Sequence, residues 1–153
     1  EFSAAIRPAT SGLVPFDLTD RGAAQERYAE CLVPALPHAV AVRELAALGS
    51  ALGWSGEQLR TPAVRQDEGP GNALMATIQY HNVSELFTSF GEKSVSAEHV
   101  ATLLARQVKA FLLRDVALGP NLADQWMLPL ALAPLTVASQ RCRATNAAIS
   151  FRG

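Results

Sequence analysis

The sequence predicts an α+β fold, and three observations support that prediction. Apolar side chains occupy every second position over residues 74–80, which is the pattern of a half-buried strand. Over residues 100–112 apolar side chains recur every three or four positions, as they do along one face of a helix. Hydrophobic residues make up 49% of the 153 positions, which is ample for a core. The chain is therefore expected to be globular, with both helices and strands.

The amino-terminal half is expected to contain three strands and one helix. Apolar residues recur at helical spacing from Ala41 onward, and Gly53 is a natural stop because glycine readily adopts the left-handed conformation. Pro62 has no N–H group, which confines its strand to the edge of a sheet. The predicted elements are a strand over residues 2–7, a loop over 8–15, a strand over 27–33, a helix from Pro37 to Leu52 and a short strand over 59–64.

The carboxy-terminal half is expected to begin with a hairpin that turns at His81-Asn82. Ser96 is a good N-cap for a long helix, and Glu98 in its first turn suits the helix dipole. Pro129 is expected to kink a second helix or to shorten its hydrogen-bond ladder. The predicted elements are strands over residues 74–80 and 83–90, a helix from Ser96 to Leu112, a helix after Gly119-Pro120, and closing strands over 135–138 and 147–151.

Charge and hydropathy narrow the classes of function. The net charge is −1, and a surface that grips an RNA backbone without help would be basic. Three arginines lie near the carboxy-terminal end: Arg141, Arg143 and Arg152. The two interpretations of this cluster are a phosphate-binding patch and a solvated tail. Proline, glycine or charge interrupts the longest apolar runs, so no membrane span is expected. No leader pattern opens the chain, and a cytoplasmic location is expected.

The cysteines and histidines do not predict a metal centre. Cys31 and Cys142 are too few and too far apart for a disulfide framework, and they suit a reducing compartment. His38, His81 and His99 do not show metal-ligand spacing with either cysteine.

The segment from Asn121 to Ala133 places an acid and an amide in the first turns of an otherwise apolar helix. With Asn121 as N-cap, Asp124 falls at the third helical position and Gln125 follows it. One interpretation is structural: Asn121 and Asp124 close the helix start. The other interpretation is a ligand site at a helix start.

Other segments decide between these interpretations. The loop Gly69-Pro-Gly-Asn72 is followed by a hairpin, by Gly91-Glu-Lys-Ser-Val-Ser-Ala-Glu98 opening a helix, and then by Asn121-Leu-Ala-Asp-Gln125. Leu36-Pro-His-Ala-Val-Ala-Val-Arg-Glu44 precedes them as a helix start. In this order and spacing the four segments resemble the carboxy-terminal half of the RNA 3'-terminal phosphate cyclases. The resemblance runs from about Phe16 to Ala138.

The resemblance implies a particular organisation. It implies a small thioredoxin-like inserted domain followed by the last repeat, a helix pair on a sheet, of a larger domain. On this basis residues 1–15 are a strand and loop of the large domain, 16–93 are the inserted domain, and 94–153 are an incomplete carboxy-terminal repeat. The remaining repeats are expected to lie outside this chain. The chain is therefore expected to associate with an amino-terminal half or with a second copy of itself. Apolar surface from Val100, Leu104, Phe111 or Trp126 is then expected to be exposed.

The resemblance also implies a reaction, the ATP-dependent conversion of an RNA 3'-phosphate into a 2',3'-cyclic phosphate. A histidine nitrogen attacks the α-phosphate of ATP and forms an enzyme–AMP adduct. AMP then passes to the RNA 3'-phosphate, and the neighbouring 2'-hydroxyl closes the ring and releases AMP. ATP and Mg²⁺ are the implied cofactors, and an RNA 3'-phosphate end is the implied partner; neither DNA nor a membrane is expected.

Site residues are carried over by position. Leu122, Ala123, Asp124 and Gln125 match the segment that cradles the nucleotide in the family, and Asp124 is also a candidate for holding the metal. Asn121 stands where the family commonly has tyrosine. Phe87, on the second hairpin strand, is a candidate for stacking on adenine, although a place in the core explains it equally well.

One departure concerns the nucleophile. Its histidine lies in a segment of the family resembling S-x-H-x-x-T-N, and the corresponding stretch here is Arg141-Cys-Arg-Ala-Thr-Asn146. Cys142 or Arg143 falls near the histidine's place, and arginine stays protonated at neutral pH. No catalytic residue is therefore matched. The alternatives are a catalytically inactive cyclase-like module for RNA processing or protein binding, and a small oligomeric domain that has lost nucleotide binding.

Overall fold

The computed structural model describes residues 3–7, 17–67, 69–132, 140–143 and 148–151, with the backbone alone for residue 17 and from 129 onward. The chain divides into two compact units. We call the unit from Arg21 to Val116 the insert unit; residues 1–20 and 117–153 form the flanking unit. The insert unit thus interrupts the sequence of the flanking unit. No helix among the described residues is long and apolar enough to cross a membrane.

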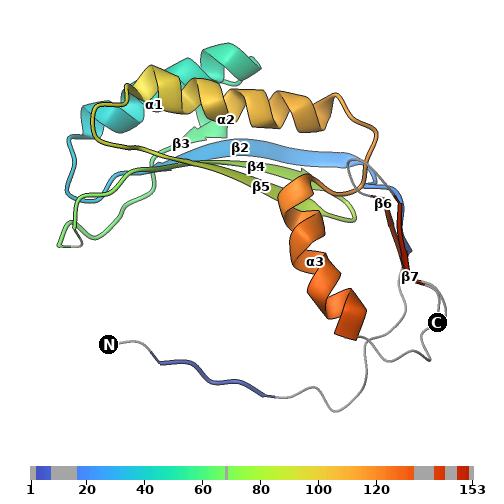
Figure 1. The fold of residues 1–153 in the computed structure, drawn as a ribbon. Helices are drawn as coiled ribbons and strands as arrows, with labels where there is room; N and C mark the ends of the chain where they lie inside the picture. The colour runs from blue at the N-terminus through green and yellow to red at the C-terminus, as the bar shows by residue number, and fades with distance from the viewer. Residues whose placement is uncertain (1–2, 8–16, 68, 133–139, 144–147, 152–153) are drawn as a thin grey trace. The chain divides into compact units, whose positions relative to one another are not determined.

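The insert unit is a four-stranded sheet with two helices on one face (Figure 1). The sheet order is β3-β2-β4-β5; β3 runs parallel to β2, and the other neighbours are antiparallel. A β-α-β part followed by a β-β-α part agrees with the thioredoxin-like arrangement that the family resemblance implies. Its elements are β2 (Ala24–Leu32), α1 (His38–Leu52), η1 (Gly56–Gln58), β3 (Leu59–Arg60), β4 (Ala73–Tyr80), β5 (Ser84–Phe90) and α2 (Ala97–Leu112).

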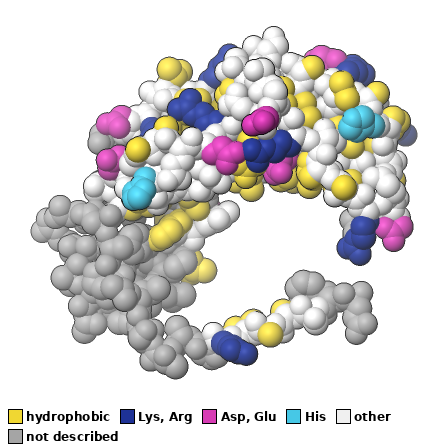
Figure 2. Space-filling model, turned by 180° about the vertical axis from the view of Figure 1, so that it is seen from behind, with side chains coloured by type: hydrophobic (Ala, Val, Ile, Leu, Met, Phe, Trp, Pro, Cys, Tyr) yellow, Lys and Arg dark blue, Asp and Glu magenta, His cyan; other side chains and the backbone are white. Residues whose placement is uncertain are grey.

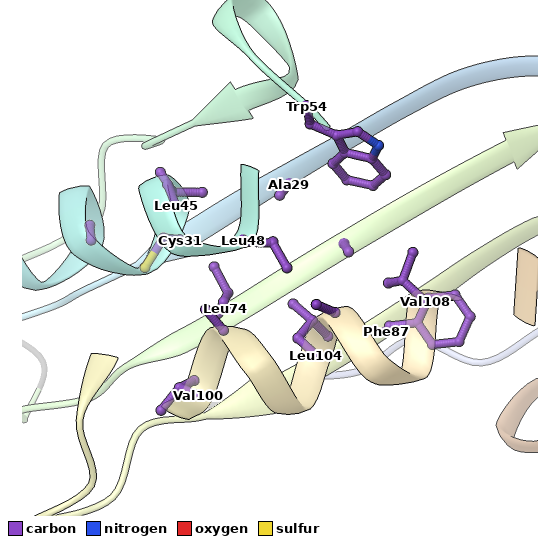
Figure 3. Close-up of a cluster of buried hydrophobic side chains, with 14 of the residues drawn as sticks. Ala29, Cys31, Leu45, Leu48, Trp54, Leu74, Phe87, Val100, Leu104 and Val108 are labelled. Carbon is purple, nitrogen blue, oxygen red and sulfur yellow. The ribbon is translucent and has the colours of Figure 1, made fainter. Parts of the chain in front are cut away.

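The core of the insert unit lies between the sheet and its two helices (Figure 3). The alternation over residues 74–80 places Leu74, Ala76 and Ile78 on the helix-facing side of β4, where all three are fully buried. Leu48 of α1 and Leu104 of α2 fill the space above them. The periodicities seen in the sequence are therefore those of the two layers that share this core.

The helix ends of the insert unit follow from local chemistry. Gly53 ends α1 with a φ of 70°, and its neighbour Trp54 donates its backbone N–H to Gly49 O at 3.0 Å. The Ser96 side chain accepts from His99 N at 3.2 Å, which confirms it as the N-cap of α2. The strand predicted over 59–64 is shorter than expected and ends before Pro62, at the edge of the sheet.

The domain boundary expected near Lys93 lies inside the insert unit. The reason is α2, which supplies Val100, Leu104 and Phe111 to the core of this unit. For the same reason these three side chains are not exposed, so the expectation of an apolar surface there was wrong. Trp126, the fourth residue of that expectation, is half-buried.

The flanking unit contains a three-stranded sheet of order β1-β6-β7. β1 pairs in parallel with β6, and β6 pairs antiparallel with β7. The strand predicted over residues 2–7 is absent over 3–7, where no described strand pairs with the backbone; the strand predicted over 135–138 lies outside the described residues. The elements of this unit are β1 (Asp17–Leu18), α3 (Pro120–Leu132), β6 (Gln140–Arg143) and β7 (Ala148–Phe151).

Candidate functional site

The start of α3 differs from the expected one. The helix begins at Pro120, and Gly119 O accepts the first helical hydrogen bond from Ala123 N at 3.0 Å. Gly119 is therefore the N-cap and Pro120 the first helical residue, a position that suits proline because it needs no N–H donor there. The prediction of Asn121 as N-cap was wrong. Asp124 lies two positions deeper than a capping-box residue, so capping does not explain it.

The predicted site residues separate by burial. Asn121, Asp124 and Gln125 are exposed, and their spacing of three and four residues places them on one face of α3. Ala123 is buried and Leu122 is half-buried, so these two anchor the turn. Asp124 and Gln125 make no side-chain hydrogen bond or ion pair within the described part of the chain. The structure thus presents two amides and a carboxylate together, with no packing role.

This exposed face, formed by Asn121, Asp124 and Gln125, offers one carboxylate and two side-chain amides to solvent. A carboxylate oxygen suits Mg²⁺, which proteins commonly hold through one or two carboxylates while substrate phosphates fill further positions. The amide of Gln125 offers both a donor and an acceptor for a hydrogen bond. Among the described residues, no group of three or more histidine, cysteine, aspartate or glutamate side chains is placed to hold a metal alone.

Phe87 lies in the core. The ring is 4% exposed, and its centroid is 5.5 Å from that of Phe111 on α2. Stacking on adenine needs an open ring face, so the core interpretation of Phe87 is the one its geometry supports.

Cys142 and Arg143 belong to the central strand of the flanking unit. Cys142 is in register with Leu18 of β1 and with Ile149 of β7. Arg143 is paired with Ala148 at the end of the same strand. Thr145 and Asn146, which follow in the matched segment, lie outside the described residues. The three histidines all belong to the insert unit, at the start of α1, in the β4–β5 turn and in the first turn of α2.

Sequence reasoning missed a polar cluster formed by the buried Cys31 and Glu44 and the half-buried Asn72. The Glu44 side chain is 0% exposed. Its two oxygens accept hydrogen bonds from the Cys31 thiol at 3.2 Å and from Asn72 Nδ2 at 2.5 Å. The cluster therefore ties α1 to β2 and to the residue that leads into β4. The spacing of Glu44 from Ala41, Leu45 and Leu48 on one helical stripe was the available sign that this acid faces the core.

Burial and the neighbouring acid both act on Cys31. Burial raises the pKa of the thiol, and the hydrogen bond to Glu44 and the charge of that carboxylate raise it further. A thiol held in its neutral form is a poor nucleophile. Cys31 thus acts as a buried hydrogen-bond donor.

The buried cluster also explains two motif segments. Asn72 ends the Gly69-Pro-Gly-Asn72 loop, and Gly91 N donates to Asn72 O at 3.1 Å. A Cβ at Gly91 would lie 2.8 Å from Asn72 Cβ, so only glycine fits there. Both segments, with Leu36 and Val40, line a surface cavity of about 430 Å³. Glu44 also lines this cavity, but it is 0% exposed and its carboxylate accepts hydrogen bonds from Cys31 and Asn72, so the cluster holds the loops together.

Comparison with known proteins identifies relatives for most of the chain. Residues 19–113 match the family described as "RNA 3'-terminal phosphate cyclase (RTC), insert domain". An RNA 3'-terminal phosphate cyclase of Pseudomonas aeruginosa is 39% identical over 133 residues, which is 87% of this chain and 38% of the relative. One from Salmonella enteritidis is 41% identical over 128 residues, 84% of this chain and 37% of the relative. The chain thus spans about 38% of the length of the relatives it matches.

The match and the fold agree in extent. The insert unit, Arg21–Val116, has nearly the bounds of the family match, and it is inserted in sequence within the flanking unit. By fold and by sequence, this chain belongs to the RNA 3'-terminal phosphate cyclase family.

Proposed function

We propose that the chain is part of an ATP-dependent RNA 3'-phosphate cyclase, in which the start of α3 binds the nucleotide. The observation that carries the proposal is the exposed face formed by Asn121, Asp124 and Gln125. It coincides with the segment that resembles the family's nucleotide-binding segment. Neither capping nor packing accounts for these side chains.

In this proposal the residues of α3 hold and orient the nucleotide. Asp124 would hold Mg²⁺, whose charge would offset the repulsion between this carboxylate and an anionic nucleotide. Gln125 donates or accepts a hydrogen bond at the nucleotide. Ala123 and Leu122 are packed inward and fix the turn that carries both side chains. The metal neutralises charge on the phosphates when it is bound.

The chain by itself is proposed not to form the enzyme–AMP adduct. The stretch that matches the family's nucleophile segment holds Cys142 and Arg143 where the histidine is expected. This departure also favours a second candidate, a catalytically inactive cyclase-like module for RNA processing or protein binding. Incubation with α-labelled ATP and Mg²⁺, followed by denaturing electrophoresis, separates the possibilities. Absence of stable label is expected; label on the protein overturns this part of the proposal.

Nucleotide binding is tested with Asp124→Asn. We expect the variant to bind ATP about tenfold more weakly in the presence of Mg²⁺, with an unchanged melting temperature, because the carboxylate has no structural partner. Asp67→Asn, which removes an exposed carboxylate from a loop of the insert unit, is the matched control. Isothermal titration calorimetry measures the binding. No Mg²⁺-dependent binding of ATP to the unchanged chain would contradict the assignment.

A further inference from the structure

A groove runs along α2 on the helical side of the insert unit. Its floor and walls include Ala105 and Ala110 of α2 and Ala51 at the end of α1, and its volume is about 450 Å³. Leu113 lies at one end with 87% of its surface exposed. At 1.5 Å per residue, the stripe from Thr102 to Leu113 is about 16 Å long, or three helical turns.

Two cations flank this apolar floor. Arg106 and Lys109 both line the groove and are exposed. Neither side chain forms an ion pair or hydrogen bond with another described residue. By contrast, Arg43 of α1 is neutralised by Glu98, with Arg43 Nε and Glu98 Oε1 2.9 Å apart. Among the described residues, no acidic side chain lines the groove. The groove thus combines apolar contact area with positive charge that has no partner in the insert unit.

We propose that this groove binds an acidic amphipathic helix of a partner protein. Such a helix would lay its apolar stripe over Ala105, Ala110 and Leu113, as helices do in helix-in-groove complexes. Glutamate or aspartate beside that stripe would meet Arg106 and Lys109, which supplies the charge complementarity of a specific interface.

The composition of the groove favours this occupant over an RNA strand. None of the described residues that line the groove is aromatic, so they offer unpaired bases no stacking platform. Acidic and basic side chains are interspersed on the described surface that Figure 2 shows, and no broad basic area that would follow a phosphate backbone is seen on that face.

The same charges disfavour a second copy of this chain. A two-fold pairing of α2 with itself would bring Arg106 and Lys109 of one copy against the same cations of the other, because such an interface joins identical patches. Like charges placed opposite each other weaken association. The occupant is therefore expected to be heterologous and acidic.

The test uses the 153-residue chain and a labelled helical peptide with leucines along one face and glutamates on both sides of it. Fluorescence anisotropy is expected to show saturable binding, and a peptide with lysine in place of glutamate is expected not to bind. The double variant Arg106→Glu, Lys109→Glu should weaken binding about tenfold or more, and Arg106→Lys should largely retain it. Lys93→Glu, which reverses an exposed cation outside the groove, is the matched control.

Arg106, Lys109 and Lys93 are exposed, so the melting temperature of each variant should equal that of the unchanged chain. Equal binding of the two peptides overturns the proposal, as does a loss of affinity that Lys93→Glu reproduces. Light scattering that shows a dimer lost on charge reversal overturns it in favour of self-association. Competition by a single-stranded RNA oligonucleotide that depends on Arg106 and Lys109 overturns it in favour of nucleic acid.

Discussion

The starts of α2 and α3 show how similar sequence patterns are used differently. Ser96 closes the start of α2 through its hydrogen bond to His99 N, and Glu98 binds Arg43. At the start of α3 a glycine and a proline close the helix instead, and Asn121 and Asp124 are left exposed. Polar residues at a helix start are structural in the first case and available to a ligand in the second.

The same contrast extends to the two units. In the insert unit the buried Glu44 and Cys31 and the half-buried Asn72 form hydrogen bonds with one another. The face formed by Asn121, Asp124 and Gln125 has no such role. The comparison predicts that substitutions in the insert unit lower stability, whereas substitutions on this face of α3 leave stability unchanged and alter binding.

The largest effect is expected for Asn72→Ala. Removal of the amide leaves the Glu44 carboxyl group buried with one hydrogen bond fewer, and it leaves a cavity beside Gly91. The loss is expected to be about 2–3 kcal/mol of unfolding free energy. Urea denaturation followed by circular dichroism measures it, and Asn121→Ala is the matched control. A similar loss in both variants would remove the contrast between the units.

Alkaline pH provides a second test, because burial and Glu44 raise the pKa of Cys31 in the folded state. The folded protein keeps the proton that the unfolded chain releases, so the stabilisation is complete below the unfolded pKa of about 8.5 and is lost as pH rises above it. Cys31→Ser keeps a hydroxyl donor for Glu44 and does not titrate in this range. Stability of the variant should therefore fall less steeply between about pH 9 and 10.5; parallel curves would contradict the assignment.

Ser96→Ala tests the helix starts directly. Loss of the cap should cost about 1 kcal/mol, because the backbone N–H of His99 loses its side-chain acceptor. The matched change at the other helix, Asn121→Ala, should cost almost nothing. Thermal denaturation of the two variants side by side gives the difference, and equal melting temperatures would show that the starts of α2 and α3 do not differ in this way.

The smallest effect is expected for Glu98→Gln. Hydrogen bonds from its own backbone N–H and from Arg43 hold the pKa of this carboxyl group below its usual range. A lowered pKa stabilises the fold above the unfolded value of about 4.3, and the stabilisation is lost as pH falls through the folded value. The side chain is solvent-exposed, so the change should be small at pH 7 and should become smaller still as pH falls below the unfolded value. A loss of stability in Glu98→Gln that grows as pH falls would contradict this prediction.

Much of the insert unit was predictable from sequence. The alternation over residues 74–80, the helical stripe of α2, the stop at Gly53 and the cap at Ser96 are local patterns, and the structure confirms each. The family resemblance rested on segments that the comparison also matches. Local patterns succeed because side-chain period and helix-end chemistry act over only a few residues.

The candidate site was predictable in composition but not in geometry. The sequence placed Asp124 and Gln125 in a helix. It assigned the N-cap to Asn121, because asparagine is preferred over glycine at that position. The competing start, glycine followed by proline at the first helical position, prevailed. That outcome removed the structural explanation for Asp124.

The sequence by itself determined the α+β class, the order of the elements in the insert unit and the membership of the family. Tertiary structure alone decided that α2 belongs to the insert unit. In the sequence α2 lies between the β4–β5 hairpin and α3, and its apolar stripe does not show which of them it packs against. In the structure that stripe packs into the core of the insert unit. Tertiary structure also brought together Glu44 of α1, Cys31 of β2 and Asn72 of the loop before β4. Contacts between residues far apart in the chain carry no local pattern, since their free energy arises only when the layers pack.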